Sequence, residues 1–286
     1  MDKRPPFCQS AGVRGLVLSI AVLLVLTVAT IAGWREAVAS PRVVFYDVAL
    51  AAWPRGAAPL RLVQLSDIHM GGPDMPAARV EGIVARVNAL RPDVVVLTGD
   101  FHGGKWVDPD SGNLDDAIRP LAALRSRYGT FAVRGNHDEP FWTPQVLPRY
   151  RMTYLQNAHA TVGPLTIAGV DDRSTGHADV AAALKGIAPV RPVVLLMHEP
   201  DGFADVPASV ALTLAGHTHG GQVRLPIVGA VFTNTRLGYV RGRYVAGGRT
   251  LIVTSGLGTS GLPLRRGVPP EIVVVTLHAP IAPRTR

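Results

Sequence analysis

Five apolar segments of the chain end in side chains that can bind metal ions. The clearest is residues 214–221, where an apolar run leads into His217 and His219 between glycines. Apolar runs bounded by glycine are typical of buried strands that end in loops, and residues two apart on an extended chain point to the same side. The other four ends contain Asp67 and His69, Asp100, Asn136 and His137, and His198. If these ends meet, they bring together two carboxylates, one amide oxygen and several imidazoles.

These ligand types favour a particular class of cation. Imidazole nitrogen together with carboxylate or amide oxygen suits Mn, Fe, Zn or Co better than Ca or Cu(I). The only cysteine is Cys8, so neither an intrachain disulfide nor a multi-thiolate site can form. Because the set is too large for one tetrahedral ion, we expect two divalent ions. Such a pair lowers the pKa of bound water and stabilises the charge that develops when a phosphoester is displaced.

The segments between these ends alternate between strand and helix patterns. Apolar residues at helical spacing predict a helix over residues 77–90, which Pro92 ends. Alternating strands and helices predict an α/β architecture with a buried sheet, in which ligands bind at the carboxyl ends of strands. The expected strands cover residues 43–48, 60–65, 93–98, 130–133, 166–170, 193–197, 210–215, 251–254 and 271–277, and the other expected helices cover residues 114–128 and 179–185.

The N-terminal region contains an uncharged apolar segment over residues 15–34. About 20 apolar residues are enough to cross a bilayer as a helix, and Lys3, Arg4 and Arg14 before it predict that the N-terminus stays inside. The alternative is a signal peptide cleaved near Ala37-Val38-Ala39, but the apolar run is long for one, so we favour an uncleaved anchor. The expected division is a cytoplasmic N-terminus at 1–14, a transmembrane anchor at 15–34, a linker and first strand at 35–58, a catalytic domain at 59–278 outside the membrane and a tail at 279–286.

The chain carries a formal charge of +8, which favours an anionic partner such as phosphate or acidic lipid. Its arginines are scattered rather than interleaved with aromatic residues, so we expect no nucleic-acid partner. Arg265 and Arg266 follow a glycine-rich segment, where they either contact a phosphate or lipid headgroup or are plain surface charge.

Taken in order, the five ends resemble the motifs of the calcineurin-like metallophosphoesterases. The resemblance extends from about residue 60 to residue 277 and is carried by Asp67-Ile68-His69, Gly99-Asp100, Gly135-Asn136-His137-Asp138, His198 and Gly216-His217-Thr218-His219. The anchor, Ser255-Gly256-Leu257-Gly258 and Pro270-Glu271 are similar to the membrane-associated branch of bacterial phosphodiesterases related to YkuE and YaeI. This resemblance implies an α/β fold, a four-layer αββα sandwich of two mixed sheets with helices outside, preceded by a transmembrane helix.

The resemblance also implies a role for each candidate residue. Asp67, His69, Asp100 and His219 would hold one metal ion, and Asp100, Asn136, His198 and His217 would hold the other, with Asp100 as the bridge. His137 would protonate the leaving oxygen or steady the phosphoryl group, and Asp138 would orient His137 by accepting its other N–H. Gly103 stands where the purple acid phosphatases have a tyrosine ligand, so we do not expect their Fe(III)-dependent colour.

Together, the resemblance and the apolar segment predict a membrane-anchored phosphoesterase with a dinuclear metal centre. It would hydrolyse phosphodiester or pyrophosphate bonds by attack of a metal-bound hydroxide on phosphorus, on a lipid, a lipid-linked nucleotide sugar or another phosphoester. The alternatives are a phosphomonoesterase or nuclease of the same fold, or a non-catalytic membrane protein whose metals only brace the fold. His137 argues against the non-catalytic alternative.

Overall fold

Short runs of valine, leucine and isoleucine form the central strands of two six-stranded sheets. The computed structural model describes residues 7–106 and 113–280, and side chains from residue 13 onward. The first sheet has the order β1 (Arg42–Ala49), β14 (Glu271–His278), β2 (Leu60–Leu65), β3 (Val94–Thr98), β4 (Thr130–Val133) and β5 (Met152–Tyr154). The second has the order β12 (Gly242–Ala246), β13 (Arg249–Val253), β9 (Leu212–Ala215), β8 (Val193–Leu196), β7 (Leu165–Gly169) and β6 (Ala158–Val162).

Both sheets are mixed. The strands β2, β3, β4 and β5 run parallel to one another, and β14 pairs antiparallel with β2. In the second sheet β7, β8, β9 and β13 are parallel, whereas the outer strands β6 and β12 are antiparallel to their neighbours. The parallel strands therefore present their carboxyl ends at one edge of each sheet, where α/β proteins bind ligands.

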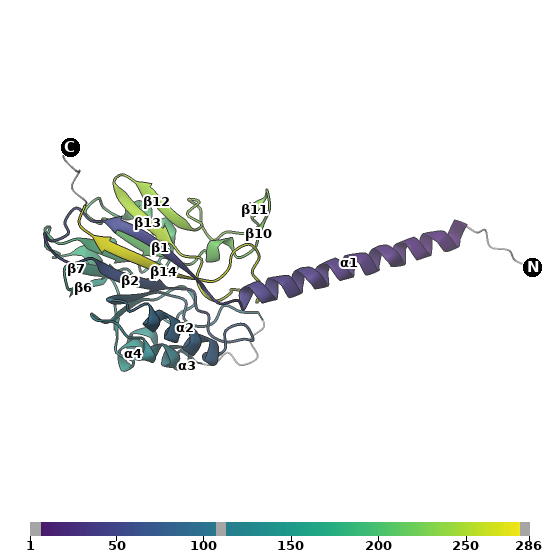
Figure 1. Ribbon diagram of the computed structural model, residues 1–286, viewed down its shortest axis with the longest axis horizontal. Helices are drawn as coiled ribbons and strands as arrows, with labels where there is room; N and C mark the ends of the chain where they lie inside the picture. The colour runs from purple at the N-terminus through teal and green to yellow at the C-terminus, as the bar shows by residue number, and fades with distance from the viewer. Residues whose placement is uncertain (1–6, 107–112, 281–286) are drawn as a thin grey trace, which may run out of the picture.

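The core is divided among the layers by the alternation of side chains along each strand. Leu62 packs between the two sheets, while its neighbour Val63 packs on the other face with the helices. The covering helix is α2 (Ala77–Ala89), which buries Val80, Ile83, Val84 and Val87. On the outer face of the second sheet, α5 (Val180–Leu184) and the 3-10 helix η2 (Pro200–Asp205) contribute Ala183 and Phe203 to a third cluster. The expected four-layer αββα sandwich is thus confirmed (Figure 1).

The expected helix over residues 114–128 is shorter than predicted. It forms α3 (Leu114–Ile118) and continues as the 3-10 helix η1 (Arg119–Ala123), because Pro120 lacks the N–H that an α-helix needs. The short elements β5, β6, β12 and α4 (Thr143–Arg149) were not expected from the sequence. Proline at positions 144 and 148 weakens the helical pattern of α4.

A single long helix, α1 (Phe7–Ala37), extends away from the sheets (Figure 1). Its stretch Val13–Ala37 contains 18 consecutive residues with a mean hydropathy of 2.6 and is long and apolar enough to cross a membrane. The last turns of α1 contact the domain: Gly33 accepts a hydrogen bond from the backbone of Arg265 at 3.0 Å, and the Glu36 carboxylate accepts one from Gly267 at 3.0 Å. Arg79 at the start of α2 donates to Ala37 O at 2.8 Å. These contacts fix the end of α1 to the segment 265–267 and to the start of α2.

Candidate dinuclear metal centre

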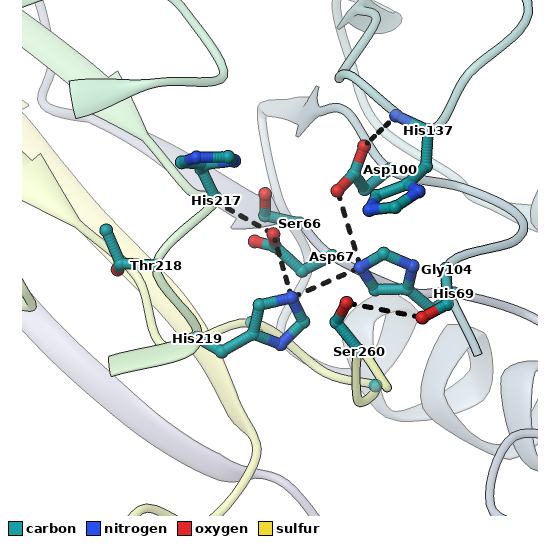
Figure 2. A network of polar contacts seen from close by, with 12 residues as sticks. Ser66, Asp67, His69, Asp100, Gly104, His137, His217, Thr218, His219 and Ser260 are labelled. Atoms are coloured by element: carbon teal, nitrogen blue, oxygen red, sulfur yellow. Dashed lines mark hydrogen bonds and ion pairs between the residues drawn. The ribbon is translucent and has the colours of Figure 1, made fainter. Parts of the chain in front are cut away.

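The candidate ligands come from the carboxyl ends of five strands. Asp67, Asp100 and Asn136 follow β2, β3 and β4 of the first sheet, while His198 and the pair His217 and His219 follow β8 and β9 of the second. Figure 2 shows the labelled side chains of this set converging from both sheets. The structure brings all seven predicted ligands together, and they divide into two groups.

The first group consists of Asp67, His69 and His219, all buried. The Nε2 atoms of His69 and His219 lie 3.1 Å apart, and His219 Nε2 lies 3.5 Å from Asp67 Oδ1 (Figure 2). Within the described residues, the other carboxylate oxygen, Asp67 Oδ2, is buried without a hydrogen-bond partner. Burying a carboxylate oxygen without a hydrogen-bond partner costs free energy unless a cation binds to that oxygen.

The second group consists of Asp100, His198 and His217. His198 Nε2 lies 3.2 Å from Asp100 Oδ2 and 3.2 Å from His217 Nδ1. Asn136 joins this group, because its Oδ1 lies 3.2 Å from His198 Nε2. His217 and Asn136 are partly exposed, so this group opens to solvent.

Asp100 connects the two groups through a single oxygen. Its Oδ2 lies 3.4 Å from His69 Nε2 in the first group and 3.2 Å from His198 Nε2 in the second. The other oxygen, Oδ1, accepts the backbone N–H of His137 at 2.9 Å (Figure 2). This division leaves Oδ2 as the atom that both groups share.

Backbone carbonyls fix the orientation of two imidazoles. His69 Nδ1 lies 2.7 Å from Gly103 O, and His198 Nδ1 lies 2.7 Å from Thr98 O. A carbonyl only accepts, so each Nδ1 carries the hydrogen and donates, which directs Nε2 at the centre. This is the arrangement that metal-binding histidines use.

The histidines of the centre differ in how their surroundings shift their pKa values. Burial alone would lower the pKa of His198, but the Asp100 carboxylate raises it well above the usual value. Burial lowers the pKa of His217 to about 4, and burial followed by the neighbouring His69 lowers the pKa of His219 well below its usual value. His217 and His219 are therefore neutral at pH 7, which is the form that binds metal ions.

The backbone of the ligand loops is unusual. Asp67, His69, Asp100, His217 and His219 have φ values between 44° and 71°, in the left-handed region that non-glycine residues rarely adopt. Such residues cost of order 1–3 kcal/mol each and cluster at functional sites. The prediction that His217 and His219 lie on an extended chain and point to the same side is wrong. Both have left-handed backbone conformations, and they enter different ligand groups.

Two glycines let the ligand loops approach one another. A Cβ on Gly135 would lie 2.2 Å from Asp100 Oδ1, and a Cβ on Gly216 would lie 2.5 Å from Asp67 Oδ2. Any side chain at either position would collide with a candidate ligand, which explains why glycine precedes both Asn136 and His217.

Comparisons with known proteins agree with this geometry. A sequence profile described as calcineurin-like phosphoesterase matches residues 60–221, which include every candidate ligand. The chain is 32% identical over 240 residues to the uncharacterized metallophosphoesterase YkuE of Bacillus subtilis, covering 79% of this chain and 82% of that protein. The chain belongs to the calcineurin-like phosphoesterase family.

Relatives with transmembrane segments are also similar. The chain is 31% identical over 283 residues to a Danio rerio protein described as a transmembrane protein with metallophosphoesterase domain, covering 91% of this chain and 62% of that protein. The chain thus spans less than two thirds of that relative's length. Among solved structures, a dimetal phosphatase from Danio rerio has 12% identity and a TM-score of 0.45, covering 77% of this chain and 93% of that one.

The two residues predicted to be catalytic occupy different surroundings. The ring of His137 lies edge-on to the ring of His69, with 5.2 Å between centroids, and its side chain reaches solvent. Burial lowers the pKa of His137. The carboxylate of Asp138 instead accepts backbone N–H groups of Asp100 at 2.7 Å, Phe101 at 2.8 Å and Gly135 at 2.8 Å. We therefore correct the expected role of Asp138: it holds two ligand loops together rather than orienting the His137 ring.

Several supporting residues were not identified from sequence. Arg265 is fully buried and donates to Gly258 O at 3.0 Å and Ser255 O at 2.8 Å, so neither the phosphate contact nor the surface charge expected of it is correct. Arg134, two residues before Asn136, pairs with Asp171 at 2.5 Å in a buried contact. No local sequence signal marks either arginine as buried.

Proposed function

We propose that this chain is a membrane-anchored hydrolase of phosphodiester or pyrophosphate bonds that uses a dinuclear metal centre. The observation that carries the proposal is the position of Asp100 Oδ2, 3.4 Å from His69 Nε2 and 3.2 Å from His198 Nε2. One acidic oxygen shared by two sets of imidazoles is what two adjacent cations need. Family membership supports the hydrolysis of a phosphoester as the reaction.

The seven candidate ligands have the chemistry for two divalent cations. Asp67, His69, Asp100 and His219 would hold the first, and Asp100, Asn136, His198 and His217 would hold the second. This assignment is supported by Asp67 Oδ2, which lacks a hydrogen-bond partner among the described residues, and by the Nε2 atoms of His69 and His219, which lie 3.1 Å apart. The donor set suits Mn, Fe, Zn or Co, which when bound supply Lewis acidity and lower the pKa of water.

The open side of the centre determines how a phosphoester approaches. His217 and Asn136 are partly exposed, and the exposed His137 lies next to His69, so the substrate phosphorus comes between these side chains. His137 is exposed next to the first ligand group, where its ring can reach a bound phosphoester. It donates a proton to the leaving oxygen or steadies the phosphoryl group.

We further propose that α1 anchors the catalytic domain to the cell membrane, with the N-terminus inside and residues 59–278 outside. The support is the long apolar stretch within Val13–Ala37, the basic residues before it, and relatives described as transmembrane proteins. The end of α1 is fixed to the segment 265–267, and Arg265 of that segment lies against His219 at 3.5 Å. The centre therefore lies beside the membrane, which favours a lipid or lipid-linked substrate.

The proposal is tested with the full chain purified in detergent. The protein is stripped with a chelator, reloaded with Mn, Fe, Zn or Co, and assayed on p-nitrophenyl phosphate, bis-p-nitrophenyl phosphate and a lipid-linked diphosphate. We expect metal-dependent hydrolysis of the diester or the diphosphate above that of the monoester. Protein that retains two ions per chain yet hydrolyses none of these compounds would contradict a catalytic function.

A further inference from the structure

Exposed apolar side chains gather at a small hairpin close to the metal centre. The hairpin consists of β10 (Arg224–Leu225) and β11 (Gly229–Ala230), joined by Pro226, Ile227 and Val228. Leu225, Ile227, Val228, Val231 and Phe232 are all exposed. Exposed apolar patches of this kind mark surfaces that contact proteins or membranes.

The hairpin and the end of α1 are attached to the same segment of chain. Arg224 of β10 donates its backbone N–H to Arg266 O at 2.7 Å. The neighbouring residues bind α1: Arg265 N donates to Gly33 O at 3.0 Å, and Gly267 N donates to the Glu36 carboxylate at 3.0 Å. Figure 1 shows β10 and β11 on the side of the domain from which α1 emerges.

The length of α1 places this shared segment at the membrane surface. An α-helix rises 1.5 Å per residue, so the 20 uncharged residues 15–34 cross a hydrocarbon core of about 30 Å and place Gly33 at its edge. Trp34 and Arg35 then lie at the headgroups, as such residues commonly do. Because Arg265 binds Gly33 directly, the base of the hairpin lies at the same level.

An apolar pocket connects this surface to the metal centre. It has a volume of about 650 Å³ and is lined by Val231, Phe232, Leu262 and Leu264, with His219 also on its wall. Pockets that bind ligands commonly have volumes of roughly 300–1,000 Å³ and mostly apolar walls. The pocket therefore extends from a candidate metal ligand to the exposed apolar side chains next to the hairpin.

Charge around the patch fits a lipid surface rather than another apolar protein face. Arg35 and Arg266 are exposed, and Arg224 is partly exposed at the base of the hairpin. Basic residues around an apolar tip are attracted to anionic headgroups while the tip enters the apolar layer.

We propose that the tip of the β10–β11 hairpin enters the lipid interface as a second membrane contact and that the apolar pocket beside His219 opens onto the bilayer to take an acyl chain of a phosphoester lipid. This inference rests on the proposed function, since it requires α1 to span the membrane. It narrows the substrate class to lipids whose phosphoester reaches the centre while the chain stays in an apolar environment.

The membrane contact is tested by fluorescence quenching on the full chain in vesicles of phosphatidylcholine and phosphatidylglycerol. Cys8→Ser removes the native thiol, and a dye is attached at Val228→Cys, at Val25→Cys within α1, or at Val190→Cys. Val190 is a matched control, because it is an exposed valine before the amino end of β8, at the end of the strand opposite the site. Lipids with brominated chains should quench the dye at 228 and 25, and aqueous iodide should quench it only at 190.

The quenching pattern separates this inference from the anchor on which it rests. Lipid quenching at position 25 combined with iodide quenching at position 228 would overturn the hairpin contact and leave the anchor intact. A dye at 228 protected from both quenchers would show a protein partner, such as a second copy of the chain, and would also overturn the inference. Absence of lipid quenching at 25 would overturn the anchor itself, whether or not the centre hydrolyses phosphoesters.

The acyl pocket is tested with two diesters that share a leaving group, hexadecyl p-nitrophenyl phosphate and methyl p-nitrophenyl phosphate. Burial of a few methylene groups should raise kcat/KM for the hexadecyl ester at least about 10-fold over the methyl ester. Phe232→Asp should bring this ratio towards one, whereas Val190→Asp should leave it unchanged. Equal kcat/KM values for both esters in the unaltered chain would contradict the acyl pocket, and hydrolysis of neither would contradict the proposed function instead.

Discussion

The two ligand groups of the centre differ in depth. Asp67, His69 and His219 are buried, whereas the group around Asp100 and His198 includes the partly exposed His217 and Asn136. The deep group also contains Asp67 Oδ2, which has no hydrogen-bond partner in the part of the chain that the structure describes. We infer that the deep group holds its cation tightly, while the open group exchanges its cation and admits the phosphoester.

Different supports explain this difference. The deep group is enclosed by the segment that follows β13, where Gly258 N donates to Asp67 O at 2.7 Å and Arg265 holds the same loop from within. The loop that contributes Asn136 to the open group is supported by the buried ion pair between Arg134 and Asp171. Contacts from neighbouring loops thus support both groups, and the ligands of the deep group are the more completely buried.

The largest effect is expected from Asp100→Ala, because Asp100 is common to both groups. The variant should lose both ions and at least about 10³-fold in kcat/KM, since the charge stabilisation of the centre is lost. Asp93→Ala is the matched control, because Asp93 precedes the other end of β3, where its carboxylate accepts the backbone N–H of Arg61 at 2.8 Å. Metal analysis and bis-p-nitrophenyl phosphate hydrolysis measure both quantities, and full activity of Asp100→Ala would refute the bridge.

His137→Gln should separate catalysis from metal binding. Its imidazole reaches solvent beside both groups and is not a member of either, so the variant should keep two ions. Loss of a proton donor should lower kcat by about 10²–10⁴-fold. Measuring ion content and kcat on the same preparation distinguishes a catalytic role from metal binding. Loss of an ion together with the activity would show that His137 is a metal ligand.

His219→Ala and His217→Ala compare the deep and open groups directly. Each substitution should weaken the ion of its own group by at least about 100-fold, because even loss of a residue that supports a ligand costs 10–100-fold. After mild dialysis against a chelator, His217→Ala should retain the deep ion and His219→Ala should lose it. The ion content of the two dialysed variants gives the answer, and the reverse pattern would show that burial does not set affinity here.

The smallest effect is expected in the support of the open group. Burial would raise the pKa of Asp172, but hydrogen bonds with Glu199, Thr175 and Ser174 hold it well below its usual value. A lowered pKa in the folded state stabilises the protein above the unfolded value of 3.8, and this contribution is lost as pH falls. Asp172→Asn should therefore lower the free energy of unfolding by about 1–3 kcal/mol at pH 7 and by less at pH 3.

Chemical denaturation at the two pH values measures this change. Asp205→Asn provides a control, because Asp205 is an exposed aspartate whose carboxylate pairs with Arg173 at the surface. A loss for Asp172→Asn that is equal at pH 7 and pH 3 would show that the charge of Asp172 does not contribute.

Much of this fold follows from local patterns. The strands expected at residues 60–65 and 130–133 coincide with β2 and β4, because apolar runs with two buried faces have clear ends. The edge at which the site lies could also be predicted, because parallel strands present their carboxyl ends at the same edge of a sheet. The strand β12 was missed because its side chains alternate between partly buried and exposed, with arginine and tyrosine in place of an apolar run.

The remaining features depend on contacts that no short segment encodes. The left-handed backbone of His217 and His219 sends these two histidines, which are two residues apart, to different groups, and this conformation has no signal in their residue types. From its residue type, Arg265 is expected at the surface. It is buried because the loop after β13 folds around its guanidinium group. The attachment of α1 to residues 265–267 joins positions more than two hundred residues apart, so only the folded chain reveals it.

The bridging role of Asp100 is tested most directly by anomalous diffraction from crystals of the full chain loaded with manganese. Our account predicts two anomalous peaks about 3.5–4 Å apart on either side of Asp100 Oδ2, one next to His69 and His219 and the other next to His198 and His217. A single peak, or two peaks that do not share Asp100, would contradict it.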